Sequence, residues 1–229
     1  ENLNLFLKAL ALCSNATIDQ DKSGTWKAIG DPTEAALVTA AAKAGYPKEE
    51  LEQSTYQRLK EVPFSSETKY MAVSYETTNQ DHYLFVKGAP SVVLEMCDSE
   101  LTTAGQRKLT STRINELKDK NQALAQDGLR VLAVAYQENS KAETEAEIAA
   151  TIDSGLVFVG LAGILDPPRQ EVSNAIAEAQ SAGIETKMIT GDQRDTALSI
   201  AQQIGIQKSS TSNLSGQEIE EMTTLQFNR

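Results

Sequence analysis

Residues 188–192, Met-Ile-Thr-Gly-Asp, have the types and the setting of a phosphate site. A short apolar strand is predicted over 184–189, and a helix with apolar residues at helical spacing over 195–204. A tight turn between a strand and a helix exposes backbone N–H groups, and the helix N-terminus adds partial positive charge. Thr190 adds a hydroxyl donor, whereas Asp192 repels a phosphate unless a divalent cation or a proton lies between them. The turn therefore indicates Mg²⁺-dependent phosphate chemistry, with a simple N-capped turn as the alternative.

The composition excludes several classes of protein. The 229 residues suffice for one large domain or two small ones, and 40% of them are hydrophobic, as in an ordinary globular protein. A formal net charge of −11 argues against nucleic acid as a partner. The longest apolar run, 155–165, is too short to cross a membrane, so we predict no direct membrane insertion by this segment. Cys13 and Cys97 lie far apart beside a single histidine, which predicts reduced thiols in a cytosolic protein and no metal site.

The first two thirds of the chain have the pattern of an α+β domain with an antiparallel sheet flanked by helices. Alternating apolar residues over 69–75 and 82–86, separated by a polar turn, predict an antiparallel hairpin. Asp31 is the expected N-cap of a helix whose first turn holds Pro32 and Glu34. The other predicted elements are helices over 3–13, 90–97, 103–126 and 141–152, a loop or hairpin over 17–29, and a strand over 129–136.

The last third of the chain has a different pattern. A strand over 156–165, a helix over 168–182, the strand over 184–189 and the helix over 195–204 predict a right-handed parallel unit of a partial α/β, Rossmann-type segment. Two prolines in 166–169, Asp-Pro-Pro-Arg, stiffen the join between the two patterns, which suits a hinge.

Six short motifs follow one another along the chain: Gly30-Asp31-Pro32-Thr33-Glu34, Phe64-Ser65 with Lys69, Lys87-Gly88-Ala89-Pro90, Leu129-Arg130-Val131-Leu132, Asp166-Pro167-Pro168-Arg169 and Thr190-Gly191-Asp192. In this order and spacing they resemble the cytoplasmic headpiece of cation-transporting P-type ATPases, and most closely the type II, calcium-pump-like branch. The resemblance covers nearly the whole chain. It implies a nucleotide-binding (N) domain at 1–165 and a partial phosphorylation (P) domain of haloacid-dehalogenase-like fold at 166–229.

The resemblance also implies ligands and partners. ATP and Mg²⁺ are the expected cofactors, and the rest of the P domain, the actuator domain and the transmembrane domain are the expected partners. The chain is then a cytoplasmic part of an integral protein of the cell membrane. It begins without methionine and ends in polar sequence, so we expect a piece of a longer protein.

Three residues of the first motifs are expected at the nucleotide. The resemblance implies that the Glu34 carboxylate accepts from the adenine amino group, that Phe64 stacks on the base, and that Lys69 lies beside the nucleotide. The residues by themselves allow plainer roles: a capping-box residue for Glu34, ordinary core for Phe64 and a solvated side chain for Lys69.

The next two motifs are expected to complete the nucleotide pocket. Lys87 ends an apolar strand, and Gly88 after it leaves room for a ligand against the backbone. The resemblance makes Lys87 a pocket lysine and Gly88 part of the adenosine wall. It implies that Arg130 reaches the phosphates and that Leu132 packs on the nucleotide; an edge salt bridge is the alternative for Arg130.

The last two motifs are expected at the phosphoryl group. The resemblance implies that Thr190 and Gly191 hold the transferred phosphoryl group. It implies that Asp192 and Asp166 help to position the phosphate and close the two domains. Arg169 is then a contact to the ribose or phosphates after closure, although Asp166 and Arg169 also suit a structural ion pair at the hinge.

The sequence departs from the family pattern in three places. Ser66 stands where an arginine is frequent, which removes one phosphate contact, and Gln193 replaces the usual Asn or His. The segment 21–25, Asp-Lys-Ser-Gly-Thr, looks like the aspartyl-phosphate motif, but a polar stretch precedes it where the nucleophile needs a buried strand. We therefore expect the nucleophile upstream of the chain and the magnesium segment downstream of it, so that the chain by itself is inactive.

Two alternatives belong to other functional classes. A free-standing haloacid-dehalogenase-like phosphatase needs its own nucleophile of the Asp-x-Asp-x-Thr type at a strand end, and the sequence has none. A non-catalytic interaction module would leave Phe64 and Lys87 with purely structural roles.

Overall fold

The computed structural model describes residues 2–20, 23–24, 26–139, 141–153, 155–165, 168–190 and 194–206, together with residues 214, 218 and 222. It divides into two compact units. The first comprises Glu1–Gln122 with Val131–Ile164, and the second comprises Ala123–Arg130 with Leu165–Arg229.

Among the described residues, six helices and nine strands make up the first unit, apart from residues 123–126 of α5 and Arg130 of β8, which belong to the second. They are α1 (Asn2–Leu12), β1 (Thr17–Gln20), β2 (Trp26–Ile29), α2 (Pro32–Lys43), α3 (Lys48–Ser54), β3 (Tyr56–Val62), β4 (Tyr70–Thr77), β5 (His82–Gly88), α4 (Pro90–Glu95), β6 (Cys97–Thr102), β7 (Gly105–Lys108), α5 (Ser111–Gln126), β8 (Arg130–Glu138), α6 (Glu145–Asp153) and β9 (Leu156–Ile164).

Seven of the strands form one sheet in the order β3-β4-β5-β8-β9-β6-β7, and β1 pairs with β2 as a separate hairpin. The predicted hairpin is confirmed as β4 and β5, which pair antiparallel with Tyr70 opposite Gly88 and Met71 opposite Lys87. The sheet is mixed rather than wholly antiparallel, because β6 and β9 pair in parallel.

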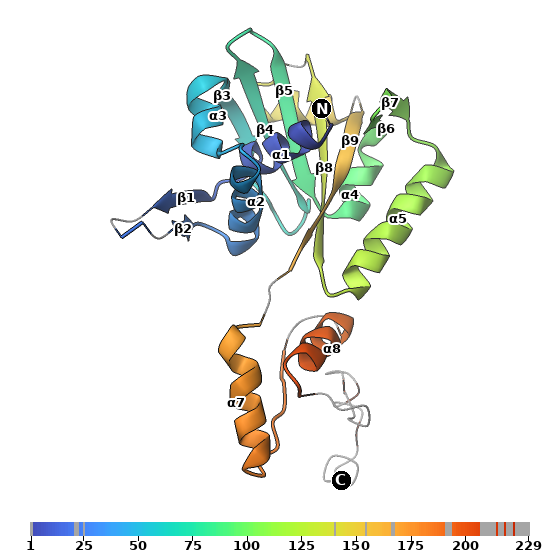
Figure 1. Cartoon of the computed structure of the whole chain (residues 1–229). Helices are drawn as coiled ribbons and strands as arrows, with labels where there is room; N and C mark the ends of the chain where they lie inside the picture. Colours follow the sequence, from blue (N-terminus) through green and yellow to red (C-terminus); the bar gives the residue numbers. More distant parts are fainter. Residues whose placement is uncertain are drawn as a thin grey trace. The chain divides into compact units, whose positions relative to one another are not determined.

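Two hydrophobic cores lie on opposite faces of this sheet. Residues of α1, α2 and α3 pack with Met71, Val73 and Phe85 on one face, in front of the sheet in Figure 1. Residues of α4, α5 and α6 pack with Leu84 and Val86 on the other face. The strand alternation therefore sends β5 side chains in turn to two helical layers, and the predicted α+β domain is confirmed.

The helix predicted to begin at 103 is wrong at its start. Residues 97–108 form the antiparallel pair β6 and β7 instead, and α5 begins at Ser111. The polar composition concealed this strand, because its buried residue Glu100 is charged. The Glu100 carboxylate accepts hydrogen bonds from Arg107 and Arg113, which makes its burial possible. Two further elements, α3 and β3, were also not predicted.

The second unit contains α7 (Gln170–Ser181) and α8 (Arg194–Gln203). The predicted strand over 184–189 is wrong, because these residues carry no strand pairing, and Ile189 is 96% exposed. The predicted parallel unit is also wrong at its first strand, since β9 pairs with β6 in the sheet of the first unit. A strand needs neighbours to satisfy its backbone hydrogen bonds, and the described part of this unit offers none. A haloacid-dehalogenase-like fold for this unit remains a prediction.

Among the described residues, no helix combines the length and the apolar character that a membrane crossing requires.

Candidate nucleotide site

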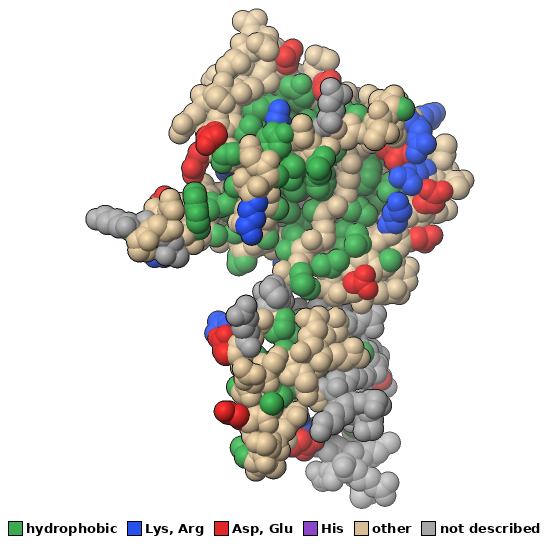
Figure 2. Space-filling model, in the orientation of Figure 1, with side chains coloured by type: hydrophobic (Ala, Val, Ile, Leu, Met, Phe, Trp, Pro, Cys, Tyr) green, Lys and Arg blue, Asp and Glu red, His purple; other side chains and the backbone are tan. Residues whose placement is uncertain are grey.

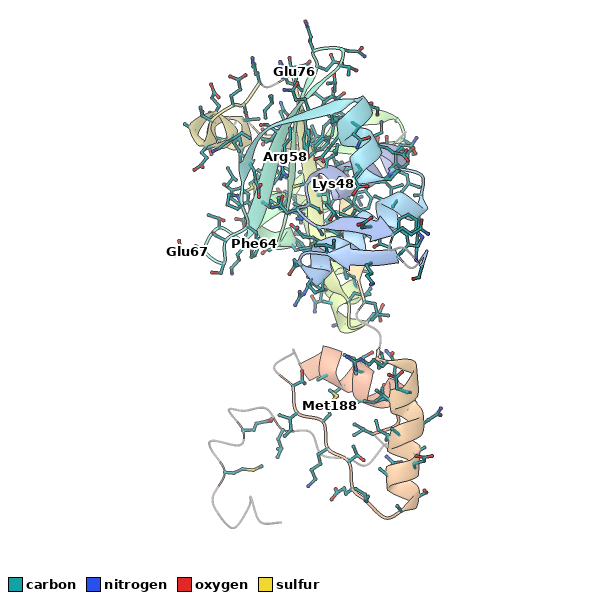
Figure 3. All side chains as sticks on the ribbon, turned by 90° about the vertical axis from the view of Figure 1, so that its left-hand side faces the viewer. Lys48, Arg58, Phe64, Glu67, Glu76 and Met188 are labelled. Atoms are coloured by element: carbon teal, nitrogen blue, oxygen red, sulfur yellow. The ribbon has the colours of Figure 1, made fainter. Side chains whose placement is uncertain are left out.

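The end of β5 and the starts of its neighbours β4 and β8 lie together at one end of the sheet in the first unit, and predicted site residues lie there. Gly88 at the end of β5 pairs with Tyr70 at the start of β4 and with Ala133 near the start of β8. Lys69, Lys87 and Leu132 are therefore brought to one end of the sheet. Figure 3 shows Phe64, which follows β3, at this end, with Glu76 at the opposite end.

Glu34 joins this sheet end through an ion pair with Lys87. Asp31 caps α2 by accepting hydrogen bonds from the backbone N–H groups of Thr33 and Glu34, which fixes the first helical turn. The Glu34 carboxylate then reaches outside its own helix. Its Oε1 lies 2.6 Å from Lys87 Nζ, and its Oε2 accepts from the backbone N–H groups of Asn15 at 2.6 Å and Ala16 at 3.1 Å. A role as a capping-box residue alone is therefore wrong.

The environment of Glu34 keeps its carboxylate ionised. The side chains of Lys87 and Glu34 are 7% and 15% exposed. Burial by itself would raise the pKa of Glu34, but the hydrogen bond and charge of Lys87 and the two backbone N–H groups lower that pKa overall. An ionised carboxylate has about four acceptor positions, and three hydrogen bonds occupy this one. Within the described part of the chain, one position therefore remains for a donor such as an amino group of a ligand.

The loop between β3 and β4 presents Phe64 and Lys69. Phe64 is 59% exposed, so a role as ordinary core is wrong, and its ring offers a surface for stacking. Lys69 is exposed and has φ of 59°, the left-handed backbone region. Its N–H donates to the Ser65 carbonyl at 2.8 Å, and its own carbonyl accepts from the Ala89 N–H at 2.9 Å.

Gly88 is required by the packing of the chain itself. A Cβ atom at this position would overlap the carbonyl oxygen of Lys69 and lie 2.8 Å from the Cα of Tyr70. The absence of a side chain therefore lets β5 approach the start of β4. A place for Gly88 in the adenosine wall stays a prediction.

The start of β8 supplies an apolar surface beside Lys87. Leu132 lies two residues before Val134, which pairs with Lys87, so the two side chains share a face of the sheet. Leu132 is half-buried against the core on this face, where Figure 2 shows apolar side chains gathered on the surface. Arg130 is the exposed first residue of β8, where the chain passes from the second unit to the first.

The remaining predicted site residues belong to the second unit or lie outside the described residues. Thr190 is exposed, and Arg169 is the exposed N-cap of α7. Gly191, Asp192 and Asp166 lie outside the described residues, as does Asp21 of the rejected aspartyl-phosphate motif. The phosphate site and the Asp166–Arg169 ion pair therefore stay predictions.

The described residues do not form a magnesium site. No three histidine, cysteine or acidic side chains gather within the described part of the chain so as to hold a metal ion. Both cysteines are free and buried, in agreement with the predicted thiols. Burial raises the pKa of the Cys13 thiol to about 11, which makes it a core residue rather than a nucleophile.

Sequence reasoning missed the polar groups that surround the Glu34–Lys87 pair. Asn15 donates its side-chain amide to Glu61 at 2.7 Å and accepts from Arg58 at 2.8 Å, and Arg58 lies 3.0 Å from Glu61. Lys48 is buried and donates to the Ser14 carbonyl at 2.6 Å. The contacts of Ser14 and Asn15 join the segment after α1 to α3 and β3, which lie 34–46 residues further along the chain, so no local pattern indicated them.

The mixed sheet between two helical layers, with the six motifs, is consistent with the N domain of a P-type ATPase. Residues 2–171 match the family described as P-type ATPase, cytoplasmic domain N, and the chain therefore belongs to that family.

Individual relatives agree with this assignment. The chain is 37% identical over 219 residues to calcium-transporting ATPase 1 of Lactococcus lactis and 40% identical over 217 residues to the calcium-transporting ATPase of Bacillus subtilis, with 96% and 93% of the chain covered. It is 38% identical over 201 residues, 87% of the chain, to the sodium/potassium exporting P-type ATPase cta3 of Schizosaccharomyces pombe. The chain spans only 19–24% of the length of these relatives.

Proposed function

We infer that this chain captures ATP for a P-type pump that moves a cation across a membrane, with calcium as the proposed ion. One observation carries the proposal: an ionised carboxylate, Glu34, is fixed by a buried lysine at the sheet end that also carries the exposed ring of Phe64. The family membership supports it independently. Relatives named for calcium support calcium as the ion. A relative named for sodium and potassium makes these two ions the alternative.

The geometry suggests how adenine is recognised. The base stacks on Phe64, and its amino group donates to the remaining acceptor position of Glu34. Lys87 and Leu132 border the adenosine on the sheet face, and Lys69 contributes positive charge at the mouth of the site. Arg130 is proposed to reach the phosphates, and Gly88 to form part of the wall.

The phosphoryl step is proposed to use an aspartate of the parent pump outside this chain. Its carboxylate oxygen bonds to the γ-phosphorus as the bond between that phosphorus and the ADP oxygen breaks, and hydrolysis of the acyl phosphate later drives transport. Thr190, Gly191 and Asp192 are the proposed phosphoryl contacts, with Asp166 and Arg169 acting at the hinge. Mg²⁺ is the proposed cofactor of this step, and the described residues do not supply its ligands.

The isolated chain is expected to bind ATP or ADP weakly and to hydrolyse neither. In the parent pump it would be a cytoplasmic domain of a protein of the cell membrane. An ATPase assay tests whether the isolated chain hydrolyses ATP. Measurable hydrolysis that Asp21→Asn abolishes would show that segment 21–25 holds a nucleophile after all.

An ATP titration followed by two-dimensional NMR tests the binding proposal directly. Saturable shifts near Phe64, Lys87 and Glu34 that vanish in Phe64→Ala are the expected result. Unchanged spectra at millimolar ATP, in a protein whose spectrum shows it to be folded, would instead favour a non-catalytic interaction module.

A further inference from the structure

Lys87 has a second partner besides Glu34. Its Nζ lies 3.0 Å from the hydroxyl oxygen of Ser14, a fully buried residue that follows α1. The Ser14 hydroxyl donates its one proton to the Leu10 carbonyl at 2.8 Å. Its lone pairs are therefore left to accept from the ammonium, so this hydroxyl is oriented as an acceptor before any ligand arrives.

The main chain next to this hydroxyl is held by another buried lysine. Lys48, at the start of α3, is 5% exposed, and its Nζ donates to the Ser14 carbonyl at 2.6 Å. Burial lowers the pKa of Lys48, and the nearby Glu52 carboxylate opposes this effect. A buried ammonium is costly unless it is hydrogen-bonded. Lys48 makes this hydrogen bond to the carbonyl of Ser14, the residue directly before Asn15.

The segment 14–16 therefore contacts both members of the ion pair. Ser14 binds the Lys87 ammonium through its side chain, while the N–H groups of Asn15 and Ala16 bind the Glu34 carboxylate. A shift of this segment would move the donor and the acceptor of the pocket together. Among the described residues, no other segment donates to the Glu34 carboxylate and also accepts from the Lys87 ammonium.

We propose that Ser14 and Lys48 are positioning residues of the nucleotide site, which set the directions of Lys87 and Glu34 without touching the ligand. This inference rests on the proposed function. It predicts that the selectivity for adenine depends on both residues. The amino group of adenine donates to the fixed carboxylate, whereas the carbonyl oxygen of guanine meets it as a second acceptor.

A purely structural role for these residues predicts a different result. Loss of packing or of local stability would weaken ATP and GTP binding to the same extent. Loss of positioning weakens ATP binding more than GTP binding, because only adenine uses the direction of the Glu34 carboxylate. The ratio of the two dissociation constants therefore separates the two roles.

The test compares Ser14→Ala and Lys48→Met with two matched controls. Ser54→Ala removes an exposed hydroxyl with the same bond to the carbonyl four residues earlier, and Lys43→Met removes an exposed lysine at the end of α2. Kd values for ATP and GTP are measured by NMR titration, after thermal unfolding has shown each variant to be folded. The side-chain resonances of Lys87 are recorded in the same samples without nucleotide.

Both test variants are expected to bind ATP about 5- to 20-fold more weakly, because misdirection of Glu34 loses part of the roughly 10- to 150-fold that one hydrogen bond to a charged group contributes. The ratio of the GTP and ATP Kd values should fall at least about threefold, a fraction of that loss. The controls should match the wild type. Wild-type selectivity in both test variants would overturn the inference.

A wild-type protein that binds neither nucleotide would refute the proposed function instead. In that case the spectra recorded without nucleotide test whether Ser14 positions the Lys87 side chain. Lys87 resonances that broaden or shift in Ser14→Ala but not in Ser54→Ala support it. Unchanged Lys87 resonances overturn it.

Discussion

The ion pair between Glu34 and Lys87 allows a quantitative test of the site through stability alone. Removing one partner of a fully buried pair costs about 3–5 kcal/mol. Here Glu34 is 15% exposed and keeps its two backbone N–H donors. We therefore expect Lys87→Met to lower the free energy of unfolding by about 2–3 kcal/mol, somewhat less than the full penalty.

A double-mutant cycle isolates the interaction within the pair. Glu34→Gln keeps the shape of the side chain but removes its charge, and the double variant removes both charges. Because each single variant leaves one buried group unpaired, the double variant should be more stable than the sum of the two changes predicts, by about 1–2 kcal/mol. Lys60 and Glu145 form an exposed pair at 3.3 Å, and the same cycle there should give less than about 0.5 kcal/mol.

The assay is urea unfolding, followed by near-ultraviolet circular dichroism, which reports on buried tyrosines of the first unit such as Tyr75. The contribution of Glu34 to the free energy of unfolding depends on pH in one definite direction. The folded-state pKa of Glu34 lies below its ordinary value of 4.5. The stability that this shift contributes is therefore present above pH 4.5 and is lost as the pH falls through the folded-state pKa. Lys87→Met should approach the wild type in stability over the same range.

Two results would refute this reasoning. A coupling no larger than that of the exposed pair would show that Glu34 and Lys87 do not depend on one another. An unchanged stability difference between the wild type and Lys87→Met at pH 7 and at pH 3 would show that the charge of Glu34 is not what Lys87 stabilises.

Three further predictions follow from single positions. Phe64→Ala should weaken ATP binding by about 1–3 kcal/mol, the value of one stacked base, in an NMR titration, while unfolding in urea stays within about 0.5 kcal/mol because the ring is exposed; equal affinity would exclude stacking. Gly88→Ala should destabilise the protein by about 2 kcal/mol or more in the same urea assay, because its Cβ would meet Lys69 and Tyr70; wild-type stability would mean that the strands separate easily. Glu100→Gln should cost about 2–4 kcal/mol at pH 7 because two arginines bind this carboxylate. Burial raises the pKa of Glu100 and the arginines lower it overall, so this difference should diminish below pH 4.5; a constant difference from pH 7 to 3 would contradict it.

The parts of the fold that the sequence predicted are those with a local signal. Alternating apolar residues defined β4 and β5, and Asp31 before Pro32 defined the start of α2. The side chains of Phe64 and Lys87 were identified through motifs, and the structure adds that one is exposed and the other is paired with Glu34.

The parts that were missed depend on contacts between distant residues. Glu100 is buried only because arginines from β7 and α5 meet it, so its strand has no apolar pattern. Lys48 begins a short polar helix, and nothing local indicates that its ammonium is buried against Ser14. The apolar run 184–189 has the composition of a strand, but a strand also needs a neighbour, which composition does not reveal.

The left-handed backbone of Lys69 sets two demands on one residue against each other. A residue with a Cβ in this region costs about 1–2 kcal/mol relative to the right-handed form, whereas glycine adopts the same backbone without steric strain. Folding alone would thus favour glycine at position 69, where φ is 59°. Under the proposed role of Lys69 beside the nucleotide, a variant collection screened for thermal stability and one screened for nucleotide affinity would accordingly diverge here, the first toward glycine and the second toward the lysine that the chain retains.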